Sequence, residues 1–381
     1  MKIIILGTSY PMRGGIAHYV ALLYKALRQR GHEVQIISFK RQYPSIFFPG
    51  KTQQDSSKEV EPIPSKPLLD SIGPLSWIRT FLEIRRQQPD LIIFKYWLPF
   101  FAPAYASIAF LTRLFTRTRV LYICDNIVPH ERKLGDTLLN RLGLAFVDYF
   151  IVQSSIVRSD LLRFRPQANF KEVPHPVYEI FKQNYTAEAA RQKLGIGLDE
   201  HVLLFFGYVR AYKGLSLLVE ALPIIREQMP IKLLVAGEFY DDKTKYLRQI
   251  EQLGLQNSVQ IFDDYIPNEE VGLYFAAANV VVLPYVSATQ SGIVQIAYNY
   301  NKPVITTDVG GLPEAVAQDV TGLVVPAQDV QALAQAILRF FKEKKEETYT
   351  ENIKEQKKQF SWERLAVAIE EFLTPALVAN E

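Results

Sequence analysis

The chain has 381 residues, of which 48% are hydrophobic and 22% are charged. These values are ordinary for a globular protein and exclude a disordered or fibrous chain, while the length favours two domains over one. The single cysteine, Cys124, excludes an intrachain disulfide and a cysteine-based metal site, so we expect a reducing, cytoplasmic environment.

Charge is distributed unevenly between the two halves. Residues 1–175 carry 24 Lys and Arg against 13 Asp and Glu, whereas residues 176–381 carry 19 against 27. The basic first half indicates an anionic partner, either acidic lipid headgroups or a phosphate-bearing acceptor, and a solvated basic face without a partner is the alternative. We expect peripheral contact with the inner face of the cytoplasmic membrane. Nucleic acid is not an expected partner, because no zinc-finger, basic-zipper or RNP-like pattern is present.

Short apolar runs in the first half alternate with stretches of helical periodicity, which predicts βαβ units around a parallel sheet. The opening MKIIILG is too short for a secretory signal and predicts a buried strand. The polar stretch 42–67 has no period and predicts a surface excursion. The predicted strands of this half are Ile3–Leu6, Val34–Ser38, Leu91–Phe94, Val120–Cys124 and Phe150–Gln153.

Residues 96–112 carry no formal charge and are close to the minimum length of a membrane-spanning helix. Pro99 and Pro103 interrupt the first half of this segment. We therefore predict a loop followed by a buried helix, the alternative being that its aromatic half contacts a bilayer.

The second half repeats the alternation after a connector near residue 175, where VPHPVYEIF contains two prolines. A charged helical stretch, Phe340–Gln359, and an amphipathic helix around Trp362–Leu373 should end the chain. The predicted strands of this half are Val202–Phe206, Leu233–Ala236, Val259–Phe262, Val280–Leu283, Val304–Thr306 and Leu323–Val325.

Three loops that follow predicted strands are suited to binding an anion, because ligands of such sheets bind beyond the carboxyl ends of the strands. Gly14 and Gly15 precede the first helix and allow close approach to backbone N–H groups, a plain turn being the alternative. After Gly207, Arg210 and Lys213 could hold a diphosphate or simply be exposed. The loop Thr289–Gly292 offers hydroxyl and N–H groups, although helix capping would explain the same residues.

Six segments in this order resemble glycosyltransferase family 4. They are Gly14-Gly15, FFGYVRAYKG, VAGE, YIPNEEVGLYFAAANVVVLPY, NKPVITTDVGGLPE and TGLVVP. The resemblance implies the α/β GT-B fold, in which two Rossmann-like doubly wound domains face each other. It implies an acceptor-side domain over residues 1–175, a nucleotide-sugar-binding domain over 176–360, and a helix over 361–381 that packs back on the first domain.

The resemblance also implies transfer of a sugar from a nucleoside diphosphate donor to a glycan or lipid-linked acceptor, with retention and without a metal or cofactor. Arg210 and Lys213 resemble the diphosphate-binding pair of the family, and Glu238 would lie near the nucleoside. Thr289, Gln290, Ser291 and Gly292 would lie near the sugar and phosphates, with Gly14, Gly15 and Gly207 completing the donor site.

The sequence departs from the family pattern at several positions. Ala288 and Ile296 occupy the places of two glutamates, so Gln290 or Gln295 would have to substitute. Asp125 stands where the family often has a histidine, and we assign a catalytic role to Asp125 or His130, a turn and a surface histidine being the alternatives. The chain could instead be another enzyme of this fold, such as a nucleotide-sugar epimerase or a sugar-phosphate synthase. A third alternative is a catalytically silent nucleotide-sugar-binding subunit.

Overall fold

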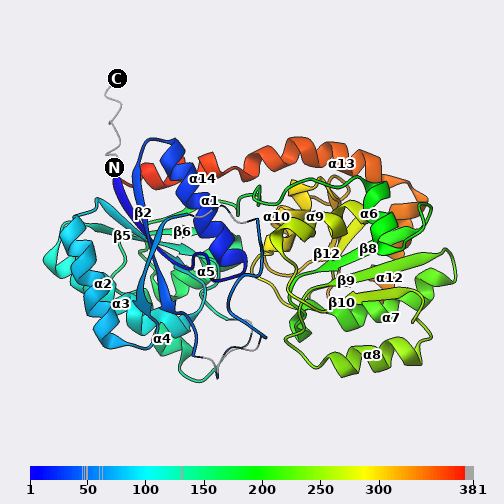
Figure 1. Ribbon diagram of the computed structural model, residues 1–381, viewed down its shortest axis with the longest axis horizontal. Coiled ribbons are helices and arrows are strands. Elements are labelled where there is room, and N and C mark those ends of the chain that lie inside the picture. Colours follow the sequence, from blue (N-terminus) through cyan, green and yellow to red (C-terminus); the bar gives the residue numbers. More distant parts are fainter. Residues whose placement is uncertain are drawn as a thin grey trace.

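The computed structural model describes residues 1–373 apart from residues 45, 47, 49, 60, 62, 130 and 132. Two α/β domains lie side by side, each built around a parallel sheet with helices on both faces (Figure 1). The predicted pair of doubly wound domains is therefore confirmed. Helices α13 (Lys345–Gln356) and α14 (Trp362–Glu370) run along the top of the molecule and return the chain from the second domain to the first.

The first domain contains a seven-stranded sheet with the order β3-β2-β1-β4-β5-β6-β7. The direction of winding reverses between β1 and β4, which is where doubly wound sheets bind ligands. Its elements are β1 (Lys2–Leu6), α1 (Gly15–Gln29), β2 (Glu33–Arg41), β3 (Ser65–Asp70), α2 (Pro74–Gln87), β4 (Leu91–Tyr96), η2 (Pro99–Phe101), α3 (Ala102–Phe115), β5 (Arg119–Cys124), α4 (Asp136–Gly143), β6 (Tyr149–Val152), α5 (Ser155–Phe164) and β7 (Phe170–Glu172).

Both edge strands of this sheet, β3 and β7, were missed by the sequence analysis. The excursion predicted for residues 42–67 ends earlier than expected, because β3 already begins at Ser65 and pairs with β2. Lys66 and Pro67 interrupt the apolar pattern of β3, and an edge strand tolerates both since it has a neighbour on one side only.

The second domain contains a six-stranded sheet with the order β10-β9-β8-β11-β12-β13, and its winding reverses between β8 and β11. All six predicted strands are present. Its elements are α6 (Ala187–Leu194), β8 (His201–Phe206), η3 (Ala211–Lys213), α7 (Leu215–Arg226), β9 (Ile231–Ala236), α8 (Lys243–Gln252), β10 (Val259–Phe262), α9 (Asn268–Ala277), β11 (Val280–Leu283), α10 (Gly292–Asn299), β12 (Val304–Thr307), α11 (Leu312–Ala315), β13 (Gly322–Val325), α12 (Val330–Lys342), α13 (Lys345–Gln356), η4 (Lys357–Phe360) and α14 (Trp362–Glu370).

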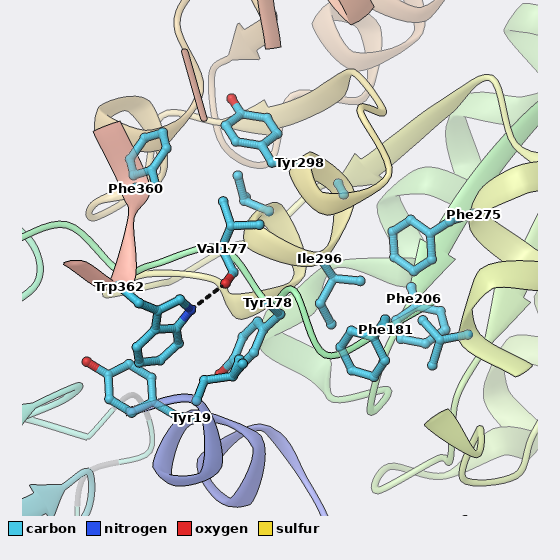
Figure 2. Close-up of a cluster of buried hydrophobic side chains, with 14 of the residues drawn as sticks. Tyr19, Val177, Tyr178, Phe181, Phe206, Phe275, Ile296, Tyr298, Phe360 and Trp362 are labelled. Atoms are coloured by element: carbon cyan, nitrogen blue, oxygen red, sulfur yellow. Dashed lines mark hydrogen bonds between the residues drawn. The ribbon is translucent and has the colours of Figure 1, made fainter. Parts of the chain in front are cut away.

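One buried cluster of side chains joins the two domains. Figure 2 shows Trp362 beside Tyr19 of α1, with Tyr178 of the connector between them and the second-domain residues. The indole N–H of Trp362 donates to the carbonyl oxygen of Val177 at 2.8 Å. Burial of these aromatic groups removes a large apolar area from water, so the cluster holds the domains against each other.

The last helix, α14, lies against α1 and ends at Glu370, three residues before the end of the predicted helix. Arg30, the residue that follows α1, forms two hydrogen bonds of 2.7 Å with the Glu370 carboxylate. This bidentate pair and the Trp362 contacts attach the end of the chain to the first domain.

The uncharged segment 96–112 folds as predicted, with a loop and a short turn leading into α3. Half of the residues of α3 are buried, while Phe110, Leu114 and Phe115 are exposed near its end. Among the helices that the structure describes, none is long and apolar enough to cross a membrane.

Candidate functional site

A cavity of about 340 Å³ lies between the domains, at the carboxyl ends of the central strands of both sheets. The loops after β1 and β5 form one wall, and the loops after β8, β9 and β11 form the other. The structure brings ten of the predicted site residues into its lining: Gly14, Gly15, Asp125, Gly207, Lys213, Glu238, Thr289, Gln290, Ser291 and Gly292.

Two predicted residues are not placed there. Arg210 lies outside the cavity lining, with its guanidinium 3.6 Å from the Glu131 carboxylate and 5.2 Å from the centre of the Tyr240 ring. Arg210 precedes the turn η3, whereas Lys213 ends it, so the two side chains leave the backbone in different places. His130 lies outside the described residues, and its predicted role stays a prediction.

Lys213 is the one cation among the described residues that line the cavity. The turn η3 ends at Lys213 and places its side chain beneath Gly207, where only 8% of the residue is exposed. Burial, assisted by the charge of Arg210, lowers the pKa of Lys213 to about 7. A buried ammonium without an ionised partner is stabilised by an anion, so this position favours a phosphate-bearing ligand.

The loop Thr289–Gly292, here called the TQSG loop, joins β11 to α10 and contacts both domains. Ser291 caps α10 by accepting a hydrogen bond of 3.2 Å from the backbone N–H of Ile293, as the capping interpretation proposed. The Thr289 hydroxyl donates to the Asn126 side chain of the first domain. The loop packs closely against Gly310, where only a glycine fits because a Cβ would collide with the carbonyl oxygen of Ala288.

Ala288 and Ile296, which replace the two glutamates of the family pattern, both line the cavity. The second substitute considered above, Gln295, is buried outside the lining, whereas Gln290 is part of it. The second-domain wall therefore carries no carboxylate at the TQSG loop. Among the described lining residues, the carboxylates are Asp125 and Glu238.

Asp125 follows β5 and forms a buried ion pair with Lys95 of β4, whose Nζ lies 2.5 Å from Asp125 Oδ1. Gln290 donates to the same oxygen at 2.9 Å from across the cleft. Burial raises the pKa of Asp125, and the Lys95 ammonium acts in the opposite direction. Lys95 was missed by the sequence analysis, although a lysine inside the apolar run LIIFKYW is a signal that could have found it.

Glu238 follows β9 and is held by the first domain through both of its carboxylate oxygens. Arg13 donates to Oε2, and the backbone N–H of Lys51 donates to Oε1 at 2.5 Å. The Arg13 guanidinium also lies 4.9 Å from the centre of the Tyr265 ring. The polar excursion of the first domain thus reaches across the cleft and contacts Glu238 in the cavity lining.

Two histidines that are not among the predicted site residues, His18 and His175, also line the cavity. Burial lowers the pKa of His18 to about 4 and that of His175 to about 3, so both are neutral near pH 7. Tyr178, next to His175, donates its hydroxyl proton to the carbonyl oxygen of Gly15 at 3.0 Å. Tyr178 thereby fixes the glycine turn at the start of α1, and the two neutral histidines leave this part of the lining uncharged.

Two family domains match the chain in the order of the two folded domains. Residues 14–174 match the glycosyl transferase 4-like domain, and residues 200–343 match the family described as glycosyl transferases group 1. Both matches are to domain families of glycosyltransferases. Both matched ranges contain cavity loops, so the cavity lies between the two matched domains.

Curated relatives carry related names. A D-inositol 3-phosphate glycosyltransferase of Corynebacterium urealyticum is 34% identical over 47% of this chain and 44% of its own length. The chain thus spans about half the length of such relatives from Corynebacterium. The O-antigen chain mannosyltransferase C of Escherichia coli is 26% identical over 87% of this chain and 85% of its own.

Solved structures confirm the GT-B fold of this chain. Sucrose-phosphate synthase from Thermosynechococcus elongatus has a TM-score of 0.75 at 22% identity, covering 98% of both chains. Alr3699/HepE of Anabaena, solved in complex with UDP and glucose, has a TM-score of 0.74 at 20% identity, covering 98% of this chain and 99% of its own. At this identity the likeness establishes the fold alone.

Proposed function

We propose that this protein is a glycosyltransferase that transfers a sugar, with retention and without a metal ion, from a nucleoside diphosphate sugar to a glycan or lipid-linked acceptor. The observation that carries the proposal is the buried Lys213 ammonium, which faces the glycine turn after β8 in a cavity between two doubly wound domains. The relatives with solved UDP and UDP-glucose complexes support a nucleotide sugar as donor.

In this mechanism the diphosphate of the donor lies against Lys213 and the N-terminus of α10, whose backbone N–H groups point toward negative charge. As the bond between sugar and phosphate breaks, the leaving diphosphate gains negative charge. A preorganised ammonium in a water-poor cavity stabilises that charge more than bulk water would. Lys213 thereby takes the part that a divalent cation plays in metal-dependent transferases.

We expect one nucleotide among UDP, GDP and ADP to raise the melting temperature of the protein, because a ligand that binds the folded state stabilises it. At a concentration of about a hundred times its Kd, such a ligand adds about 2.7 kcal/mol. A thermal-shift series with the three nucleotides and their sugar conjugates measures this. The shift should disappear in Lys213→Ala.

Three outcomes, of this series and of a turnover assay, would contradict the proposal. No shift with any nucleotide or conjugate would argue against a nucleotide-sugar site. A shift without turnover in the presence of glycan and lipid-linked acceptors would identify a silent binding subunit, whereas turnover without an acceptor would identify an epimerase.

We further propose that the first domain contacts an anionic membrane surface through α2 and α3, which pack against each other. Leu75, Ile78 and Leu82 form an exposed row on α2, and Leu114 and Phe115 are exposed at the end of α3. A cluster of exposed apolar residues on a single domain is typical of a contact surface. A lipid-linked acceptor would be reached from such a surface.

The charges around this apolar row favour anionic lipid over a neutral partner. The sequence of the two helices contains four arginines, Arg79, Arg85, Arg86 and Arg113, and one acidic residue, Glu83. Glu83 is already paired with Arg86 and Lys66. Each basic residue near an anionic bilayer contributes about 1 kcal/mol to binding.

Binding to vesicles of anionic phospholipid should therefore weaken about tenfold or more in the variant Arg79→Glu/Arg85→Glu. Sedimentation with the vesicles at low and at high salt measures the effect, and high salt should also release the unmodified protein. The matched control, Lys354→Glu/Lys358→Glu on the second half, should bind as the unmodified protein does. Equal binding of all three proteins, or no binding at low salt, would refute the membrane contact.

A further inference from the structure

We propose that Lys95 is a positioning residue, which holds the Asp125 carboxylate ionised and oriented so that its Oδ2 accepts a hydrogen bond from a hydroxyl of the donor sugar. The inference rests on the proposed function, because it assigns a role to a carboxylate in the same cavity. It names a first-domain carboxylate that would bind the sugar in place of the two family glutamates, whose positions Ala288 and Ile296 occupy.

Among the described residues, one oxygen of the lining carboxylates remains available to a ligand. Of the two carboxylates in the described lining, Glu238 already has both oxygens engaged by Arg13 and the Lys51 backbone. For Asp125, the hydrogen bonds from Lys95 and Gln290 both reach Oδ1. Within the part of the chain that the structure describes, Oδ2 of Asp125 is thus the one carboxylate oxygen of the lining that accepts no hydrogen bond.

Lys95 is buried and has a charged partner. The side chain is 2% exposed, and the Asp125 carboxylate is its ion-pair partner. Its Nζ also lies 3.2 Å from the centre of the Tyr19 ring and 3.3 Å from Gln153 Oε1. A buried ammonium is costly unless it is paired, so the fold retains Lys95 together with the charge of Asp125.

Asp125 is also linked to the second domain. Gln290 of the TQSG loop donates to Asp125 Oδ1 at 2.9 Å and approaches Gln153 Oε1 at 3.3 Å. Asp125 is therefore oriented by a first-domain lysine and by a second-domain amide at once. A carboxylate fixed in this way serves substrate hydroxyls with little reorganisation, which is the advantage of a preorganised site.

The sign of the pH effect follows from the groups around the pair. Burial raises the pKa of Asp125, and the ammonium of Lys95 opposes this rise. The other titratable groups that face the pair are Tyr19, Cys124, His175 and Tyr178. Burial keeps all four neutral near pH 7, so Lys95 is the charge that holds Asp125 ionised. Without Lys95, Asp125 would take up a proton at a higher pH than in the unmodified protein.

The test compares Lys95→Met, Asp125→Asn and the double variant by the pH profile of kcat/KM. In Lys95→Met we expect the acid limb of the profile to move up by about one pH unit or more. Asp125→Asn should remove that limb, and adding Lys95→Met to Asp125→Asn should cost nothing further, because the lysine acts through the carboxylate. An unmoved limb in Lys95→Met, or independent losses in the double variant, would overturn the inference.

A second measurement does not depend on turnover. The carboxyl ¹³C resonance of Asp125, identified by its absence from Asp125→Asn, should report an ionised group at neutral pH and a protonation that begins at higher pH in Lys95→Met. A protonated Asp125 at neutral pH in the unmodified protein would overturn the inference. Failure of sugar transfer in the unmodified protein would instead contradict the proposed function. If Lys95→Met does not fold, the same Asp125 resonance is measured in Lys95→Gln, whose amide keeps a hydrogen-bond donor but carries no charge.

Discussion

Lys213→Ala is expected to lower kcat/KM for the donor by about a hundredfold or more, the effect of removing one preorganised electrostatic donor. Lys213 is buried in the cavity wall, and no other cation of the described residues lines the cavity. The loss should fall on kcat as well as on donor affinity, because the leaving diphosphate carries more negative charge in the transition state than in the bound donor.

The matched control for this variant is Lys243→Ala. Lys243 belongs to the same domain but is paired with Asp263 away from the cavity, so its loss should leave kcat/KM unchanged. A loss of tenfold or less in Lys213→Ala would count against the assignment of the diphosphate site. Arg210→Ala separates the two predicted members of the pair, and we expect a smaller effect because Arg210 lies outside the lining.

The same lysine predicts a pH dependence of donor binding. Burial lowers the pKa of Lys213 to about 7 in the free protein, and a bound diphosphate favours the charged form. Binding should therefore be tightest below about pH 7 and weaken as the pH rises above it. Titration calorimetry across this range measures the effect. Lys213→Arg, whose charge persists at every relevant pH, should bind without this decline.

Arg13→Met is expected to lower the free energy of unfolding by about 3–5 kcal/mol, the usual cost of leaving one member of a buried ion pair alone. Arg13 and Glu238 join the two domains, and their side chains are 3% and 2% exposed. Denaturant unfolding followed by circular dichroism measures the loss. The donor site should weaken too, since Glu238 of this pair lines the cavity.

The control for the ion pair is the double variant Arg13→Met/Glu238→Gln. It leaves no uncompensated buried charge, so it should recover much of the stability lost in Arg13→Met. A loss below about 1 kcal/mol in Arg13→Met would show that the pair behaves as a solvated surface pair and that the domains open freely in solution.

The sequence by itself determined the architecture and most of the cavity wall. The apolar runs of the central strands are buried on both faces of a parallel sheet, so their composition is distinctive, and the loops that follow them must meet at one edge of the sheet. Lys213 and the TQSG loop could be placed for that reason. The edge strand β3, which is partly exposed and contains Pro67, lacks that pattern and was missed.

Only the tertiary structure decided which side chains meet. Asp125 was expected at the site, but its partner Lys95 lies 30 positions away on a neighbouring strand. Arg13 and Glu238 are 225 positions apart and meet because the domains close on each other. Periodicity and turn chemistry are properties of neighbouring residues, whereas the pairing of buried charges across a cleft depends on how two complete domains pack, which no local pattern contains.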